Sequence, residues 1–214
     1  VSTTESTSQT VSQVDSPSSA PESASSQLES AGEVSITDSN GSQITLDTSA
    51  PRVVATYGSF AEAWLLAGGE LCGVTQDALE QRDLGLPEDI AVVGTVKEPN
   101  AEEIIALEPD LVLLASDITA QADIRDVLEN AGLACAFFQV DTFADYAFMM
   151  EQLCAITGRE DLYEENVNQV GQQIEEAQAN AALSSTRPNV LLIRALSTGI
   201  KAKTDDELAG AILK

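Results

Sequence analysis

Apolar and polar residues follow no regular pattern over residues 1–31, and a periodic pattern begins abruptly at Val34. The first segment is dominated by Ser, Thr, Gln, Glu and Pro. Such a composition cannot bury enough apolar surface to offset the entropy of ordering the chain. We therefore expect residues 1–31 to form a disordered Ser/Thr-rich tether. A low-complexity tail without function would have the same composition.

The periodic part opens with two short alternating segments. Residues 34–37 and 43–46 alternate apolar and polar side chains, and Asp38-Ser-Asn-Gly41 separates them. Alternation with a period of two is typical of a half-buried strand, and Asn-Gly is a strong turn signal. The pattern predicts a β-hairpin.

From residue 52 onward, short apolar runs alternate with amphipathic segments. The runs have the length of buried strands and lie at residues 52–56, 71–75, 91–93, 111–115 and 134–140. Segments with helical spacing of apolar residues lie at residues 60–67, 101–107 and 118–131. This alternation predicts an α/β fold, with a parallel sheet covered by helices on both faces. We expect this lobe to span residues 32–142.

After residue 142 the segments with helical spacing of apolar residues become longer. Residues 143–157 and 161–182 carry apolar side chains three and four positions apart, with Gly158 between the two segments. They predict a helical connector over residues 143–186 that ends in one long helix. After Pro188 we expect a strand at residues 190–194, a turn at 197–199 and a helix from residue 206. Residues 187–214 would thus begin a second, incomplete α/β lobe.

The composition and charge of the chain exclude some classes of function and disfavour others. The net charge is −25 and the chain has no His, which excludes His-based catalysis and His metal ligation by this chain. Such acidity disfavours nucleic-acid binding. The sequence contains no uninterrupted run of about 18 apolar residues, so it predicts no membrane-spanning segment. The three cysteines, Cys72, Cys135 and Cys154, are widely spaced and odd in number, which favours buried thiols over a disulfide framework.

Two stretches resemble the class III solute-binding proteins of ABC importers. Pro51-Arg-Val-Val54, leading into Ser59-Phe-Ala-Glu62, is similar to the entry of that family's fold. Residues 94–112 are similar to its most recognisable stretch, in which a strand end, a ligand loop, a helix and the motif L-x-P-D-L-V follow in order. The long helix from Asp161 is similar to the rigid helix that joins the family's two lobes.

The resemblance implies a binding protein rather than an enzyme, with two α/β lobes and the ligand in the cleft between them. It implies capture of an iron complex outside the cell, with ferric siderophore ranked before haem and haem before cobalamin. The complex would pass to a membrane permease driven by its ATPase. We expect a monomer that is a periplasmic protein or a lipoprotein tied to the membrane only by a lipid anchor. No resident cofactor is expected, because the iron belongs to the transported ligand.

In a parallel α/β sheet, ligands bind where loops leave the carboxyl ends of the strands. The expected strands place such loops at residues 56–60, 94–99, 116–118 and 141–143. Tyr57 is the best single candidate, because an aromatic ring can stack on a porphyrin, corrin or catecholate. Ser59 either contacts the ligand or caps the helix expected from Phe60. Asp117 is a further candidate contact in its loop.

Basic residues are rare enough to be informative. Lys97 is the only one between Arg82 and Arg125, so it either contacts a ligand carboxylate or is a solvated loop residue. Arg194 is expected to end the first strand of the second lobe and to face the cleft, with Lys201 and Lys203 extending a basic wall. A guanidinium suits carboxylates and catecholates because it forms forked hydrogen bonds. Pairing of Arg194 with nearby Asp205 or Asp206 is the alternative.

Two acidic residues match a different family feature. By resemblance, Glu102 occupies the acidic position that docks onto arginines of the permease, and Glu103 is the adjacent alternative. Both also lie in the first turn of an expected helix, where acidic side chains complement the helix dipole.

Two other functions remain open at this point. Glu98, Asp117 and Asp141 at strand ends would suit Mg²⁺ in an enzyme with a flavodoxin-like domain. A sensory or adhesion module could share the fold without transport. The sequence contains neither a Gly-x-x-x-x-Gly-Lys loop nor a Gly-x-Gly-x-x-Gly motif after the first strand. It therefore gives no support for nucleotide binding.

Overall fold

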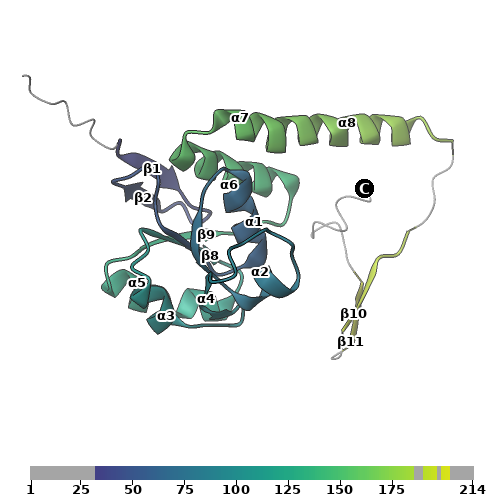
Figure 1. Cartoon of the computed structure of the whole chain (residues 1–214). Coiled ribbons are helices and arrows are strands. Elements are labelled where there is room, and N and C mark those ends of the chain that lie inside the picture. The colour runs from purple at the N-terminus through teal and green to yellow at the C-terminus, as the bar shows by residue number, and fades with distance from the viewer. Residues whose placement is uncertain (1–31, 186–189, 197–198, 203–214) are drawn as a thin grey trace, which may run out of the picture. The chain divides into compact units, whose positions relative to one another are not determined.

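The computed structural model describes residues 32–185, 190–196 and 199–202 (Figure 1). The expected tether at residues 1–31, Lys203 and the helix expected from residue 206 lie outside the described residues.

The described part of the chain contains one five-stranded sheet in the order β5-β4-β3-β8-β9. All its neighbouring strands pair in parallel. The strands are β3 Val53–Ala55, β4 Leu71–Val74, β5 Ala91–Val92, β8 Leu111–Ala115 and β9 Ala134–Phe138. The chain builds outward from β3 in one direction and then from β8 in the other. The predicted α/β class is confirmed, and a topological switch point lies between β3 and β8, where ligands bind in open α/β sheets.

Alternate side chains of each strand enter two separate cores, one on each face of the sheet. On one face, Leu113 packs in a cluster with Trp64 and Leu153. These two come from α1 Gly58–Leu66 and α6 Phe143–Thr157. On the other face, Leu114 packs with Ile104 and Leu128. They come from α3 Ala101–Ala106 and α5 Arg125–Asn130. Helices therefore cover both faces, as the sequence predicted.

The predicted hairpin is present as β1 Val34–Thr37 and β2 Gln43–Leu46. Asp38 ties it to the edge of the sheet. Its buried carboxylate accepts hydrogen bonds from the turn N–H groups of Asn40 (3.0 Å) and Ser42 (2.8 Å), and from the N–H of Phe137 in β9 (3.2 Å). The sequence therefore places a turn signal and a long-range anchor in the same residue.

The structure differs from the expected helices in two places, the start of the first helix and the continuity of the segment at residues 118–131. Helix α1 begins at Gly58 with Tyr57 as its N-cap, so Ser59 lies inside the first turn and does not cap the helix. The reason is a distant partner, because the Asp77 carboxylate accepts the Gly58 N–H at 2.8 Å. Asp77 belongs to α2 Gln76–Glu80. The single helix expected over residues 118–131 is two, α4 Thr119–Asp123 and α5, separated at Ile124.

After α6, which Gly158 ends in a left-handed conformation, the chain forms one long helical segment. It consists of α7 Glu160–Tyr163, a π-helical turn η1 Glu164–Asn168 and α8 Gln169–Ala182. Helix α8 carries a sequence of moderate amphipathicity, but none of its described side chains is buried.

Beyond α8, the described residues form an antiparallel hairpin of β10 Ile193–Leu196 and β11 Gly199–Ala202. The strand expected at residues 190–194 therefore begins three residues later. Arg194 is its second residue and does not end it. Cross-strand pairing sets this register, because Arg194 lies opposite Lys201 and Ile193 opposite Ala202.

Candidate ligand-binding edge of the sheet

A pocket of about 350 Å³ lies at the carboxyl edge of the sheet, beside the switch point. Its lining includes three residues that the sequence singled out, Tyr57, Ser59 and Asp117. The remaining lining residues are Phe60, Glu62, Ala63, Leu66, Val140, Tyr146 and Met149. The pocket therefore joins the ends of β3, β8 and β9 to one side of α1 and α6.

Tyr57 stands at this pocket as a partly exposed ring on a rigid base. Its side chain is 36% exposed, and its ring meets Phe60 edge-on with centroids 5.5 Å apart. Phe60 is buried and in turn packs edge-on against Phe138 of β9 at 6.3 Å. Aromatic contacts of this kind hold ring orientation. The Tyr57 ring is thus available to a planar or aromatic ligand without having to be ordered first.

Tyr146 adds a second phenol to the lining. Burial raises its pKa, and the nearby Cys154 and Glu62 raise it further. The phenol therefore stays protonated at neutral pH, and its hydroxyl donates to the backbone carbonyl of Asn166 at 3.5 Å. Glu62, the acidic neighbour on α1, pairs with Arg82.

The sequence did not identify Gln121, a fully buried residue of α4 behind this edge. Its side-chain amide bonds to groups just after β3, at the last residue of β8 and before β7 Glu98–Pro99. The only available sequence signal was a polar residue on the otherwise apolar side of a helical segment, and that signal is common on solvent-facing helix surfaces. Its importance depends on partners up to 65 positions away.

Lys97 lies in a second, separate pocket of about 290 Å³. It sits at the turn between β6 Gly94–Thr95 and β7, and the pocket is completed by α2, including Asp77 and Glu80. Among the described residues, Lys97 forms no ion pair. The structure therefore does not place Lys97 and Tyr57 in one pocket. The hydrogen bond from Gly58 to Asp77 links the two pockets.

The turn that carries Lys97 requires a glycine at its base. Gly94 has φ +93°, and a Cβ there would lie 2.5 Å from the Glu98 carbonyl oxygen. The Thr95 hydroxyl accepts the Glu98 N–H at 3.1 Å and closes the turn from inside. This short hairpin is therefore a defined platform rather than a loose loop.

Asp77 and its neighbour Thr75 hold unused hydrogen-bonding capacity. Asp77 Oδ1 and the Thr75 hydroxyl are buried and have no hydrogen-bond partner among the described residues. The other carboxylate oxygen of Asp77 is taken by Gly58. A side chain at position 58 would collide with it, since a Cβ would lie 2.7 Å from Asp77 Oδ2.

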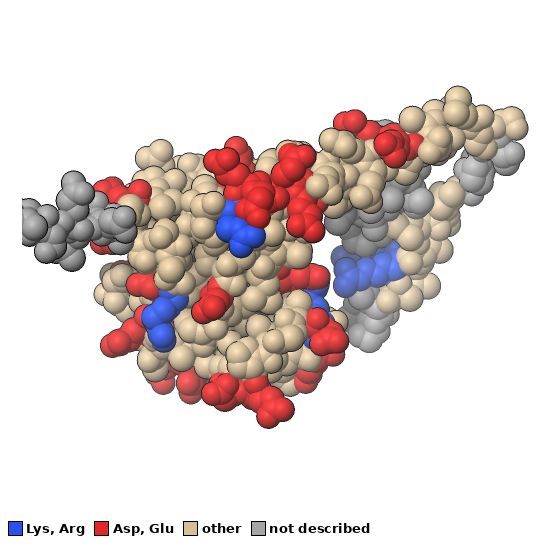
Figure 2. All heavy atoms as spheres, turned by 45° about the horizontal axis from the view of Figure 1, so that its top comes forward, with Lys and Arg blue, Asp and Glu red and all other residues tan. Residues whose placement is uncertain are grey.

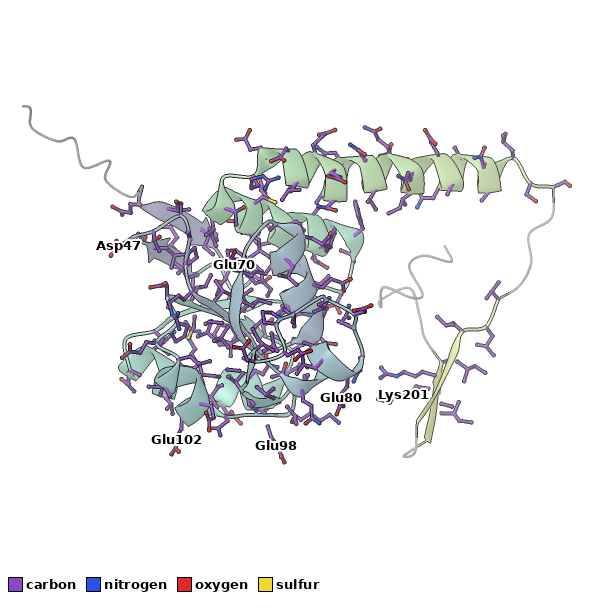
Figure 3. All side chains as sticks on the ribbon, viewed as in Figure 1. Asp47, Glu70, Glu80, Glu98, Glu102 and Lys201 are labelled. Carbon is purple, nitrogen blue, oxygen red and sulfur yellow. The ribbon has the colours of Figure 1, made fainter. Side chains whose placement is uncertain are left out.

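The two basic candidates of the hairpin are neighbours. Arg194 and Lys201 are direct cross-strand partners, and both are exposed. Directly opposite residues project to the same side of a pair of strands, so the two cations lie together. The Lys201 side chain extends away from its ribbon (Figure 3). The alternative partners of Arg194, Asp205 and Asp206, lie outside the described residues.

The two candidate docking residues occupy the exposed first turn of α3. The Asn100 side chain caps this helix by accepting the N–H groups of Glu102 (3.1 Å) and Glu103 (3.3 Å). Neither carboxylate forms an ion pair with another residue that the structure describes. Figure 3 shows Glu102 pointing outward from the lobe, on the same border as Glu98.

The acidic cluster of the enzyme hypothesis is not assembled. Asp117 lines the Tyr57 pocket, whereas Asp141 lines a pocket with Asp38 and Asp145, and Glu98 lies on the Lys97 turn. No group of three or more His, Cys, Asp or Glu side chains that could hold a metal ion occurs within the described residues. Acidic side chains are instead spread widely over the surface that Figure 2 shows. No helix in the described ranges is long and apolar enough to cross a membrane.

Comparison with known proteins gives a consistent result. A family model described as periplasmic binding protein matches residues 53–214. No curated protein matches the sequence. A substrate-binding protein of an ABC transporter from Listeria monocytogenes is similar in structure, with 23% identity and a TM-score of 0.62 over 75% of this chain and 60% of that one.

Two further solved structures have the same fold. The petrobactin-binding protein YclQ from Bacillus subtilis has 18% identity and a TM-score of 0.72, covering 85% of this chain and 64% of that one. The haem complex of IsdE from S. aureus has 19% identity and a TM-score of 0.65, covering 76% and 62%. The chain thus spans less than two thirds of the length of each. Because the family model matches most of the sequence, from the central strand β3 onward, the chain belongs to the periplasmic binding protein family, whose members are binding proteins and not enzymes.

Proposed function

We propose that this chain is the substrate-binding component of an ABC importer and captures an iron complex outside the cell. Family membership and the likeness to proteins named for siderophore and haem binding support this. The observation that carries the proposal is the pocket at the switch point, where the exposed ring of Tyr57 stands beside Ser59 and Asp117. A parallel α/β sheet binds ligands at this position.

The charges suggest that different regions contact different parts of the ligand. No Lys or Arg is among the described residues that line the Tyr57 pocket, and Glu62 and Asp117 are acidic. This pocket therefore suits the aromatic and hydroxyl-bearing parts of a ligand. Lys97 beside it, and the Arg194–Lys201 pair on the hairpin, supply the cations for anionic groups. We propose the ranking ferric siderophore, then haem, then cobalamin, because cobalamin lacks strong anionic groups.

Haem ranks second because its iron needs an axial ligand. The chain has no His, which leaves Tyr57 as the exposed candidate, and tyrosinate ligation of haem iron is chemically established. Met150 is fully buried in α6, and Met149, although it lines the pocket, is 3% exposed, so both are poor candidates.

Delivery requires a second surface. We propose that Glu102 and Glu103 dock onto basic residues of the permease, which works with its ATPase, because both carboxylates are exposed. The Asn100 cap supports this use, since it satisfies the backbone without consuming either carboxylate. We further propose an extracytoplasmic monomer, either periplasmic or held at the cell surface by a lipid anchor.

Ligand titration of the whole protein, followed by tryptophan fluorescence, tests the binding proposal. Ferric catecholate, haem and cobalamin are titrated separately. The true ligand should bind Arg194→Ala more weakly by about 1.5–3 kcal/mol, the value of a hydrogen bond to a charged group. Arg125→Ala is the matched control, because that arginine pairs with Glu129 on α5. Cobalamin binding that ignores both Lys97→Ala and Arg194→Ala would overturn the anionic-ligand assignment, and no binding of any of the three would overturn the iron-complex proposal.

Uptake measurements test the docking surface separately. Glu102→Arg should leave ligand affinity unchanged and abolish import, because the altered charge faces only the permease. Asp47→Arg is the control, since Asp47 is also exposed and lies on a different part of the lobe (Figure 3). Import that survives Glu102→Arg would show that the docking surface lies elsewhere.

A further inference from the structure

We infer that Gln121 is a positioning residue that locks three ligand loops into one arrangement, so that the Tyr57, Lys97 and Asp117 loops respond to ligand as a unit. The inference rests on the proposed ligand-binding function of those loops. It starts from one buried side chain that makes three hydrogen bonds with backbone groups and has a fourth contact with the Thr56 hydroxyl.

The geometry of the amide is unambiguous. Gln121 Oε1 accepts the backbone N–H of Ala115 at 2.7 Å and lies 2.6 Å from the Thr56 hydroxyl, whose single hydrogen also has the Leu113 carbonyl within reach at 2.9 Å. Gln121 Nε2 donates to the carbonyl oxygens of Thr56 at 2.8 Å and Val96 at 3.1 Å. An N–H can only donate and a carbonyl can only accept, so these backbone partners fix which end of the amide is which.

Each partner lies next to a candidate ligand residue. Thr56 immediately precedes Tyr57, and Val96 immediately precedes Lys97. Ala115 ends β8, two positions before Asp117. Gln121 therefore joins the two sides of the switch point and connects both to the Lys97 turn, although the three loops are far apart in sequence.

Complete burial makes these bonds hard to replace. Gln121 and Thr56 are both 0% exposed, so water cannot take over a broken contact. An apolar side chain at position 121 would leave the buried Ala115 N–H and the carbonyl of the half-buried Val96 without this partner, and the unpaired buried N–H is the costlier loss. The least expensive relief is outward movement of the loops toward solvent, where these groups can be hydrated.

A purely structural role for Gln121 predicts a different outcome. If the residue only filled space in the core, its loss would lower global stability and leave the three loops no more mobile than other surface segments. If it couples the loops, its loss should loosen all three together. The effect of a substitution in one of the loops on ligand affinity should then depend on whether Gln121 is present.

Hydrogen exchange of the ligand-free whole protein separates these outcomes. In Gln121→Met, amides of residues 57–59, 95–98 and 116–118 should all exchange at least about tenfold faster, a loss of order one hydrogen bond. Leu128→Ala is the control, because it truncates a fully buried side chain that makes none of these hydrogen bonds, and it should lower stability without selecting these loops. Unchanged exchange in the three loops, or loosening of one loop alone, would overturn the inference.

Gln121→Glu supplies a second readout that a space-filling role would not produce. A glutamate carboxylate cannot donate to the Thr56 and Val96 carbonyls, whereas its protonated form can donate to one of them. Loop protection in this variant should therefore recover as the pH is lowered, relative to the original protein at the same pH. A pH-independent difference would count against the assigned hydrogen bonds.

Ligand titration with a ferric catecholate completes the test. Lys97→Ala should weaken binding severalfold in the original protein and by a clearly smaller factor when combined with Gln121→Met, because Lys97 is then no longer held in place. Equal effects in both backgrounds would contradict coupling. If the original protein binds no iron complex, the proposed function fails, whereas the exchange experiment on the ligand-free protein still decides the role of Gln121.

Discussion

Strand β8 and the β10–β11 hairpin are both rich in apolar residues, yet their burial is opposite. Every residue of β8 is buried, with exposures of 0–1%. In the hairpin, Ile193 is 52% exposed and Ile200 is 75% exposed. Strand β8 has a neighbour on each side and a helical layer on each face, whereas the hairpin strands have only each other among the described residues. An isolated two-stranded hairpin is marginal in water, so apolar sequence alone does not ensure burial.

The same difference extends to the candidate ligand contacts. Tyr57 and Asp117 lie next to a buried network centred on Gln121, and the Asp77–Gly58 bond steadies α1. Arg194 and Lys201 are positioned within the described residues only by the strand pairing that places them opposite each other. We therefore expect the sheet edge to be organised before ligand binds and the hairpin cations to adjust to it.

The largest expected effect contrasts the two regions directly. Leu113→Ala should lower the free energy of unfolding by about 2–5 kcal/mol, because it leaves a cavity in a close-packed core. Ile200→Ala should change it by no more than about 0.5 kcal/mol, as for an exposed residue. Urea unfolding of both variants measures the contrast. A similar large loss for Ile200→Ala would show that the hairpin is buried in the whole protein and would break the comparison.

A glycine pair sharpens the view of the sheet edge as a rigid platform. Gly94→Ala should destabilise the protein by roughly 1–3 kcal/mol and weaken ligand binding, because φ is positive and the new Cβ would meet the Glu98 carbonyl. Gly132 also has a positive φ, of +86°, but a Cβ there would meet nothing within 4 Å. The difference in unfolding free energy between the two alanine variants isolates the close contact. Equal losses would show that the Lys97 turn yields easily.

A smaller effect concerns the start of α6, where the stabilisation provided by the Asp145 carboxylate should depend on pH. The Thr142 hydroxyl and backbone N–H groups donate to Asp145 and lower the pKa of its carboxyl group. A lowered folded-state pKa means that the stabilisation is present above the unfolded-state value, about 4, and is lost as the pH falls through the folded-state value. Asp145→Asn should therefore cost at most about 1 kcal/mol at pH 7, since the group is only half-buried and solvent weakens the interaction.

The cost of Asp145→Asn should shrink as the pH falls from about 4 through the lower folded-state pKa, because the original carboxyl group then becomes protonated in the folded protein. Thermal unfolding at several pH values measures this. Thr142→Ala should reproduce the loss at pH 7, because it removes the other half of the capping box. A cost that does not vary with pH would mean that the charge of Asp145 is not what stabilises the loop.

Thiol labelling, the mildest perturbation, reports local burial. Burial raises the pKa of Cys135 to about 12, so little reactive thiolate forms at neutral pH. Cys72 is less buried and its pKa is also raised. In the native protein Cys72 should react first with an alkylating reagent and Cys135 last, as read by mass spectrometry, with all three thiols reacting in denaturant. Early labelling of Cys135 would reveal that the sheet opens readily.

Local patterns predicted much of the fold. The hairpin of residues 34–46 and the segment of α6 were predicted with the bounds that the structure has, because turn residues, strand alternation and helix caps act over a few positions. The candidate residues Tyr57, Ser59 and Asp117 were found for a related reason. In an α/β fold, the residues that follow the strands lie at one edge, and strand ends can be read from the sequence.

Features that depend on distant partners could not be predicted in this way. The start of α1 depends on Asp77, 19 positions from Gly58. The register of β10 depends on β11, and the separation of Lys97 from the Tyr57 pocket depends on how α2 packs. By itself the sequence determined most of the strands and longer helices and which residues follow the strands, because those preferences are local, but it did not predict α2 or the short β6–β7 hairpin. Only the tertiary structure decided that Gln121 connects the loops, because a buried amide acquires its role from backbone groups that folding alone brings within hydrogen-bonding distance.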